Sequence, residues 1–167
     1  MNLWDALKRQ DIPACLRICA GTDGSVTLLL ELLTGKAVTV STLEQSVIKA
    51  TPDIAGLLEI EDGDEVNNRL VTLSANGTVY VLAKSLSAIN RMPHEVRSDL
   101  MRADIPIGRI LREHKIETRR DILKIEMVRS EFFGDVPVLS REYRIIYKGK
   151  ALMWINECFP VDGRWRM

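Results

Sequence analysis

The chain has 167 residues, of which 46% are hydrophobic and 28% charged, a composition typical of one soluble globular domain with its own core. Lysine plus arginine and aspartate plus glutamate each number 23, so the net charge is zero and the basic excess of a dedicated nucleic-acid binder is absent. No apolar run approaches the ~18 residues of a membrane-spanning helix, so we expect neither a nucleic-acid nor a membrane partner.

The cysteines and histidines form no metal-binding or redox pattern. Cys15, Cys19 and Cys158 are odd in number and include no CxxC pair, so we expect free thiols in a reducing cytoplasm. His94 and His114 lack the closely spaced ligands of a zinc site. Neither GxGxxG nor GxxxxGKS/T occurs in the chain. The sequence therefore predicts a cytoplasmic protein without metal or cofactor.

The first part of the chain predicts helices followed by a strand. Residues 1–21 read as an amphipathic helical extension that is broken at Pro13. Ser25 is suited to cap a helix that runs through Leu33, and Gly35 suits the left-handed position after its end. Residues 37–48 are rich in β-branched side chains, which favours a strand.

The middle of the chain predicts a hairpin and two short helices. Residues 51–64 begin with Thr-Pro-Asp and end in an acidic turn. Residues 66–88 contain two apolar runs about Asn76-Gly77, the strongest short signal for a hairpin. Helices are expected to begin near Pro93 and Pro106, because proline is favoured in the first helical turn.

The last part of the chain predicts a second hairpin. Residues 114–128 fit a strand or a helix equally well, whereas residues 140–160 form two alternating runs about Lys148-Gly149-Lys150. Strands that form hairpins, rather than alternating with long helices, favour one mainly antiparallel sheet with helices packed on one face. We therefore predict an α+β fold in a single domain over residues 1–167.

Glu157 does not fit the apolar pattern of its strand. It lies among Ile155, Cys158 and Phe159, where a buried charge requires a partner. A tight turn would place Arg141 opposite Glu157, whereas a slip of one residue would turn the two side chains to opposite faces. The pair is either a purely structural ion pair or part of a site.

Two further features suit a small anionic ligand. The helix start at Pro106-Ile107-Gly108 leaves backbone N–H groups free, and Gly108 allows close approach to the backbone. Arg69 begins an otherwise apolar strand and offers a planar fork for a carboxylate. The alternatives are an ordinary proline-initiated helix and a solvated arginine at a sheet edge.

Taken in order, a series of short segments resembles the chorismate pyruvate-lyase family, most closely its archaeal and actinobacterial branch. The resemblance extends over roughly residues 22–160 and includes Asp23–Thr27, Asn68–Val71, Ala83–Ile89, Ile105–Gly108, Ile116–Thr118, Arg141–Ile145, Gly149-Lys150 and Asn156–Phe159. It implies a chorismate lyase-like fold, in which helices cover one face of an antiparallel sheet and enclose a ligand cavity. The implied reaction converts chorismate into pyruvate and 4-hydroxybenzoate without a cofactor.

The resemblance also implies roles for particular residues. Arg69 and the main-chain amide of Ile107 would hold the ring carboxylate, with Gly108 beside them. Glu157 would meet the ring oxygen on the C4 side, and Arg141 would either balance Glu157 or touch the pyruvyl carboxylate. A further backbone contact is implied for the loop around Thr34, where this chain diverges from the family.

Two other functions stay open from the sequence. Ligand-sensing domains of some bacterial transcription regulators resemble the lyases and would make this a non-catalytic module for an aromatic acid. Those domains usually follow a winged-helix domain, and the resemblance here begins near residue 22, which favours an enzyme. A lyase-like protein acting on another aromatic acid is the third reading. The sequence leaves open whether the chain forms a homo-oligomer.

Overall fold

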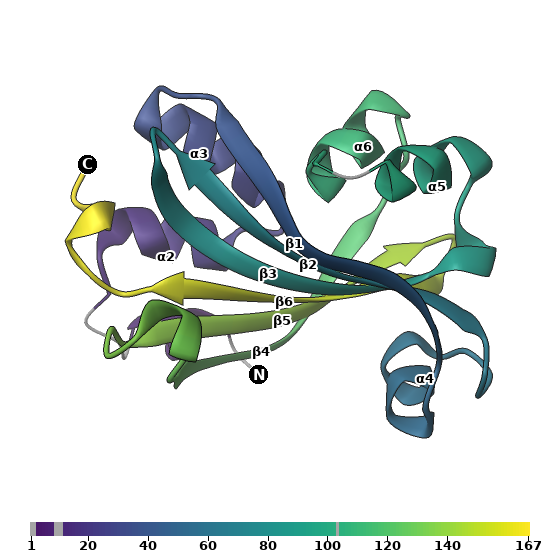
Figure 1. The fold of residues 1–167 in the computed structure, drawn as a ribbon. Helices are drawn as coiled ribbons and strands as arrows, with labels where there is room; N and C mark the ends of the chain where they lie inside the picture. The colour runs from purple at the N-terminus through teal and green to yellow at the C-terminus, as the bar shows by residue number, and fades with distance from the viewer. Residues whose placement is uncertain (1–2, 9–11, 103) are drawn as a thin grey trace.

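The computed structural model describes residues 3–8, 12–102 and 104–167. Its centre is a six-stranded sheet with the order β1-β2-β3-β6-β5-β4, and every neighbouring pair is antiparallel (Figure 1). The strands are β1 (Val38–Lys49), β2 (Glu65–Ala75), β3 (Thr78–Ala88), β4 (Arg119–Val128), β5 (Val138–Tyr147) and β6 (Lys150–Pro160).

Both predicted hairpins are confirmed, and their turns explain why. Asn76 and Gly77 between β2 and β3 have φ of 50° and 78°, and Lys148 and Gly149 between β5 and β6 have φ of 49° and 75°. Two successive positive φ values match the twist of paired strands. The ambiguous segment 114–128 is resolved in favour of a strand, because β4 pairs with the outer edge of β5.

The helices begin and end largely at the predicted signals. They are α1 (Leu3–Lys8), α2 (Ala14–Gly21), α3 (Val26–Thr34), α4 (Pro52–Leu58), α5 (His94–Met101) and α6 (Ile107–Glu113), with 3₁₀ turns at Ile89–Arg91, Glu131–Phe133 and Gly163–Trp165. The Oγ of Ser25 accepts a hydrogen bond from the N–H of Leu28 at 3.3 Å, and Gly35 ends α3 with φ of 64°. Parts of the predicted extension, residues 1–2 and 9–11, lie outside the described residues. None of the described helices has the length and apolar character needed to cross a membrane.

Helices α2, α3, α5 and α6 cover one face of the sheet, which confirms the predicted α+β architecture (Figure 1). Side chains of β5 and β6 such as Leu139, Ile145 and Ile155 point into this layer. Helix α4 is an addition to the predicted arrangement, because it packs against Leu86 and Trp154, which alternate onto the opposite face. The main helical layer is therefore the place to look for an enclosed site.

Candidate functional site

The strand register brings the two predicted charged residues to the same face of the sheet. Arg69 pairs with Ser85, and Ser85 pairs with Ile155. Glu157 lies two residues further along β6 and pairs with Arg141. Because side chains alternate along a strand, all five point into the helical layer. The uncertain register of the second hairpin is thus settled, with Arg141 and Glu157 on one face.

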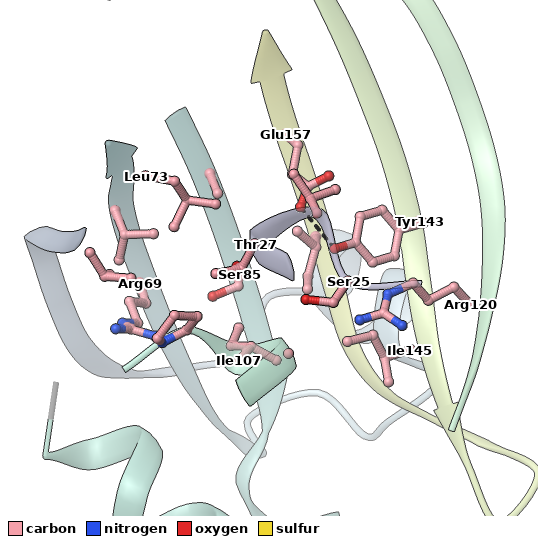
Figure 2. Close-up of a pocket in the computed structure, with 17 residues that line it drawn as sticks. Ser25, Thr27, Arg69, Leu73, Ser85, Ile107, Arg120, Tyr143, Ile145 and Glu157 are labelled. Atoms are coloured by element: carbon pink, nitrogen blue, oxygen red, sulfur yellow. Dashed lines mark hydrogen bonds between the residues drawn. The ribbon is translucent and has the colours of Figure 1, made fainter. Parts of the chain in front are cut away.

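A cavity lies between this face of the sheet and the first turns of α3 and α6 (Figure 2). Its polar lining comes from Ser25, Thr27, Arg69, Ser85, Arg120, Tyr143 and Glu157, and the start of α6 contributes Pro106, Ile107 and Gly108. Its apolar lining comes from Val26, Val40, Val71, Leu73, Ala83, Ile145 and Ile155. The hollow, including its mouth, measures about 540 Å³.

Arg69 lies at one end of the cavity and is only 2% exposed. Its Nη1 and Nη2 atoms donate to the carbonyl oxygen of Ile105 at 3.2 and 3.3 Å, while its Nε atom is buried without a partner in the described chain. Burial lowers the pKa of Arg69 from its ordinary value, and nearby Asp104 partly offsets that effect. A buried guanidinium without a carboxylate partner favours the binding of an anion.

Glu157 faces the cavity and is held from behind by two side chains. Nε and Nη2 of Arg141 donate to its Oε2 atom at 3.1 and 2.6 Å, and the hydroxyl of Tyr143 donates to its Oε1 atom at 3.0 Å. Burial, followed by the charge of Glu157, raises the pKa of Tyr143, so its hydroxyl remains a donor. The carboxylate is therefore fixed in orientation and its charge is matched.

Arg141 is itself fully buried and is not among the residues that line the cavity. Burial alone would lower its pKa, but Glu157 reverses this effect and the net direction is upward. Its remaining terminal nitrogen donates to main-chain carbonyls at the end of α2, those of Cys19, Ala20 and Thr22, at 3.2, 3.0 and 2.8 Å. Of the two predicted roles of Arg141, the geometry matches the partner of Glu157.

The first turns of α3 and α6 meet at the cavity. Backbone N–H groups in the first turn of a helix have no acceptor within the helix, and the helix dipole places positive potential there. A Cβ atom on Gly108 would stand 2.8 Å from the Oγ of Ser25, so glycine is what allows the two helix starts to approach. The cavity therefore offers amide donors as well as arginine donors to an anion.

Four of the predicted site residues line this cavity: Arg69, Ile107, Gly108 and Glu157. Thr34 does not, because it ends α3, and its hydroxyl donates to the carbonyl of Leu30 at 2.6 Å. It is the start of α3, not its end, that reaches the cavity.

Arg120, Tyr143, Ser25, Thr27 and Ser85 also line the cavity and were not predicted. Arg120 and Tyr143 pair with apolar residues of the neighbouring strand, Ile145 and Ile122, on the same face. The alternation of side chains along the predicted strand that contains Tyr143 could have shown that this residue faces the site. The same reasoning could not be applied to Arg120, because the sequence of residues 114–128 fitted a strand and a helix equally well.

Comparison with known proteins gives these features a family context. The family model described as "Chorismate pyruvate-lyase Rv2949c-like" matches residues 21–166. The protein named "Putative lyase MJ0807" from Methanocaldococcus jannaschii is 35% identical over 162 residues, which cover 89% of this chain and 79% of that protein. The "Chorismate pyruvate-lyase" of Mycobacterium leprae is 26% identical over 160 residues, which cover 86% of this chain and 73% of that protein.

Solved structures share the fold at low sequence identity. PhnF from Mycobacterium smegmatis has a TM-score of 0.68 and 15% identity, and the match covers 82% of this chain but only 64% of PhnF. The effector domain of PhnF alone has a TM-score of 0.65 and 16% identity, with 83% of this chain and 90% of that domain covered. At such identities the likeness shows a common fold, while the family match confirms the resemblance drawn from the sequence.

Proposed function

Because this chain belongs to the Rv2949c-like chorismate pyruvate-lyase family, we propose that it eliminates pyruvate from chorismate to give 4-hydroxybenzoate without a cofactor. The observation that carries this proposal is that Arg69 and Glu157 face one cavity from different strands. A guanidinium, free amide groups and a single oriented carboxylate suit a small ring compound that carries acid groups.

In this mechanism Arg69 and the main-chain amide of Ile107 hold the ring carboxylate. Glu157 accepts a hydrogen bond from the hydroxyl group at C4 and assists loss of the proton from C4. The bond between C3 and the ether oxygen breaks, its electron pair leaves with the enolpyruvyl group, and protonation of that group gives pyruvate. Aromatisation of the ring drives the reaction, so the task of the protein is to orient the substrate and to stabilise charge on the departing oxygen.

The test is to incubate the purified protein with chorismate and to measure pyruvate and 4-hydroxybenzoate as separate products. We expect both products in equal amounts from the wild type and neither from Arg69→Ala, with the circular dichroism spectrum unchanged. Arg119→Ala is the matched control, because Arg119 is exposed and pairs with Asp121 away from the cavity. Full turnover by Arg69→Ala would remove the role of Arg69, and absence of both products from the wild type would refute the activity.

A ligand-binding module for an aromatic acid is the second candidate function, and the fold shared with the PhnF effector domain favours it. The same incubation separates the two candidates. Binding of 4-hydroxybenzoate by the wild type, without pyruvate from chorismate, would support the binding module against the lyase.

A further inference from the structure

Arg120 occupies the opposite end of the cavity from Arg69. It pairs with Ile145 near the start of β4, and its guanidinium lies beside Ser25, across the cavity from Arg69 (Figure 2). The position that a Cβ atom on Gly108 would take is 3.9 Å from Nη2 of Arg120. The guanidinium is therefore at the place where the first turns of α3 and α6 meet.

None of the described carboxylates forms an ion pair with Arg120. Its Nη1 atom donates to the main-chain carbonyl of Asp23 at 3.2 Å, and its Nε atom is buried without a partner in the described chain. The neighbouring Arg119 pairs with Asp121, and Arg109 pairs with Glu31, but Arg120 forms no ion pair with a described residue. A guanidinium carries five N–H donors, so most of those on Arg120 remain available.

Two buried hydroxyl groups lie on the cavity wall between the two arginines. Thr27 and Ser85 are 5% and 4% exposed, and both line the cavity (Figure 2). Thr27 belongs to the first turn of α3, two residues after the capping residue Ser25. Both residues therefore add hydroxyl groups to the cavity wall between the two arginines.

The charged side chains around the cavity indicate what kind of ligand it can bind. Glu157 is neutralised by Arg141, which leaves Arg69 and Arg120 as two cationic ends of one cavity. Arg69 is on β2 and Arg120 is on β4, four strand positions apart, which is about 19 Å between their backbones at ~4.8 Å per strand. Both side chains line the same cavity, so their guanidinium groups are closer together than their backbones. A ligand with one carboxylate can satisfy one end only, whereas a dianion can satisfy both.

We infer that Arg120, with the first turn of α3, forms a second carboxylate subsite that makes the cavity selective for ring compounds with two acid groups. This inference rests on the proposed function and deepens it, because chorismate carries a ring carboxylate and an enolpyruvyl carboxylate. Arg69 holds the first and Arg120 holds the second, on the leaving group. Arg120 is then close to the ether oxygen on which charge develops as the C3–O bond breaks.

The product provides the first test, because 4-hydroxybenzoate lacks the second carboxylate. We expect Arg120→Ala to raise KM for chorismate roughly 10- to 100-fold, the effect of one lost charge-assisted contact. The inhibition constant of 4-hydroxybenzoate should change less than about twofold, and Arg120→Lys should recover part of the loss. Arg69→Ala, which is expected to be inactive, should bind 4-hydroxybenzoate more weakly in calorimetry, and Arg119→Ala should weaken neither ligand. Equal factors for chorismate and 4-hydroxybenzoate in Arg120→Ala would overturn the subsite.

A second test does not depend on turnover. The ligands 3-(carboxymethoxy)benzoate and 3-methoxybenzoate differ in the second carboxylate, and their dissociation constants are measured by calorimetry at one ionic strength. We expect the wild type to prefer the dicarboxylate at least about tenfold and Arg120→Ala to lose that preference. A wild type that forms no pyruvate but keeps the preference would refute the lyase and retain the subsite. Equal affinity of the wild type for both ligands would refute the subsite alone.

Discussion

Replacing Arg141 by methionine tests whether Glu157 depends on its partner. Glu157 is 5% exposed, and in Arg141→Met it would keep only the hydrogen bond from the hydroxyl of Tyr143. Removing one partner of a buried ion pair costs about 3–5 kcal/mol, because the other charge stays buried and uncompensated. The carbonyls of Cys19, Ala20 and Thr22 would lose their shared donor as well. Against a typical stability of about 5–15 kcal/mol, this loss is large.

The magnitude is measured by urea unfolding followed by circular dichroism at neutral pH. We expect the free energy of unfolding of Arg141→Met to fall by about 3–5 kcal/mol, equivalent to a decrease of about 6–20 °C in Tm for a chain of this size. Changing Glu157 to glutamine in the same chain removes the stranded charge, so the double variant should recover at least about 2 kcal/mol. Arg119→Ala is the control and should leave stability unchanged, because its ion pair is exposed. A loss below about 1 kcal/mol in Arg141→Met, or no recovery in the double variant, would refute the reasoning.

Two further predictions concern a close contact and an acid-labile pair. Gly108→Ala should lower the rate of pyruvate release at least about tenfold, because its Cβ would stand 2.8 Å from the Oγ of Ser25 and separate the two helix starts. Gly56→Ala, where a Cβ meets nothing within 4 Å, is the control and should leave the rate unchanged. The hydrogen bond from Arg164 lowers the pKa of Asp162 from its ordinary value of 3.8. The pair therefore stabilises the fold fully above pH 3.8, and this stabilisation is lost as the pH falls through the lowered pKa. Asp162→Asn should therefore cost up to about 1 kcal/mol at neutral pH, a modest value because the pair is partly exposed, and nothing in strong acid. An equal cost in urea unfolding at both pH values would contradict that assignment.

Four of the six predicted site residues lie together in the structure, and the residues that the prediction missed are ones whose side chains meet across the sheet. Arg69, Ile107, Gly108 and Glu157 line one cavity, whereas Thr34 lies at the far end of α3. The sequence shows that Ser25 caps a helix, but it does not show what the first turn of that helix faces. That depends on Gly108, which belongs to a helix distant in sequence.

The sequence by itself determined the local structure of this protein. Asn76-Gly77 and Lys148-Gly149 set both hairpin turns, and Ser25 and Gly35 set the ends of α3, because each acts through backbone angles or hydrogen bonds within a few residues. Only the tertiary structure decided that Arg120 joins the cavity. Its place follows from the pairing of β4 with the outer edge of β5 and from the packing of two helix starts over that face. Contacts of this kind depend on register and burial across the whole sheet, which no short stretch of sequence specifies.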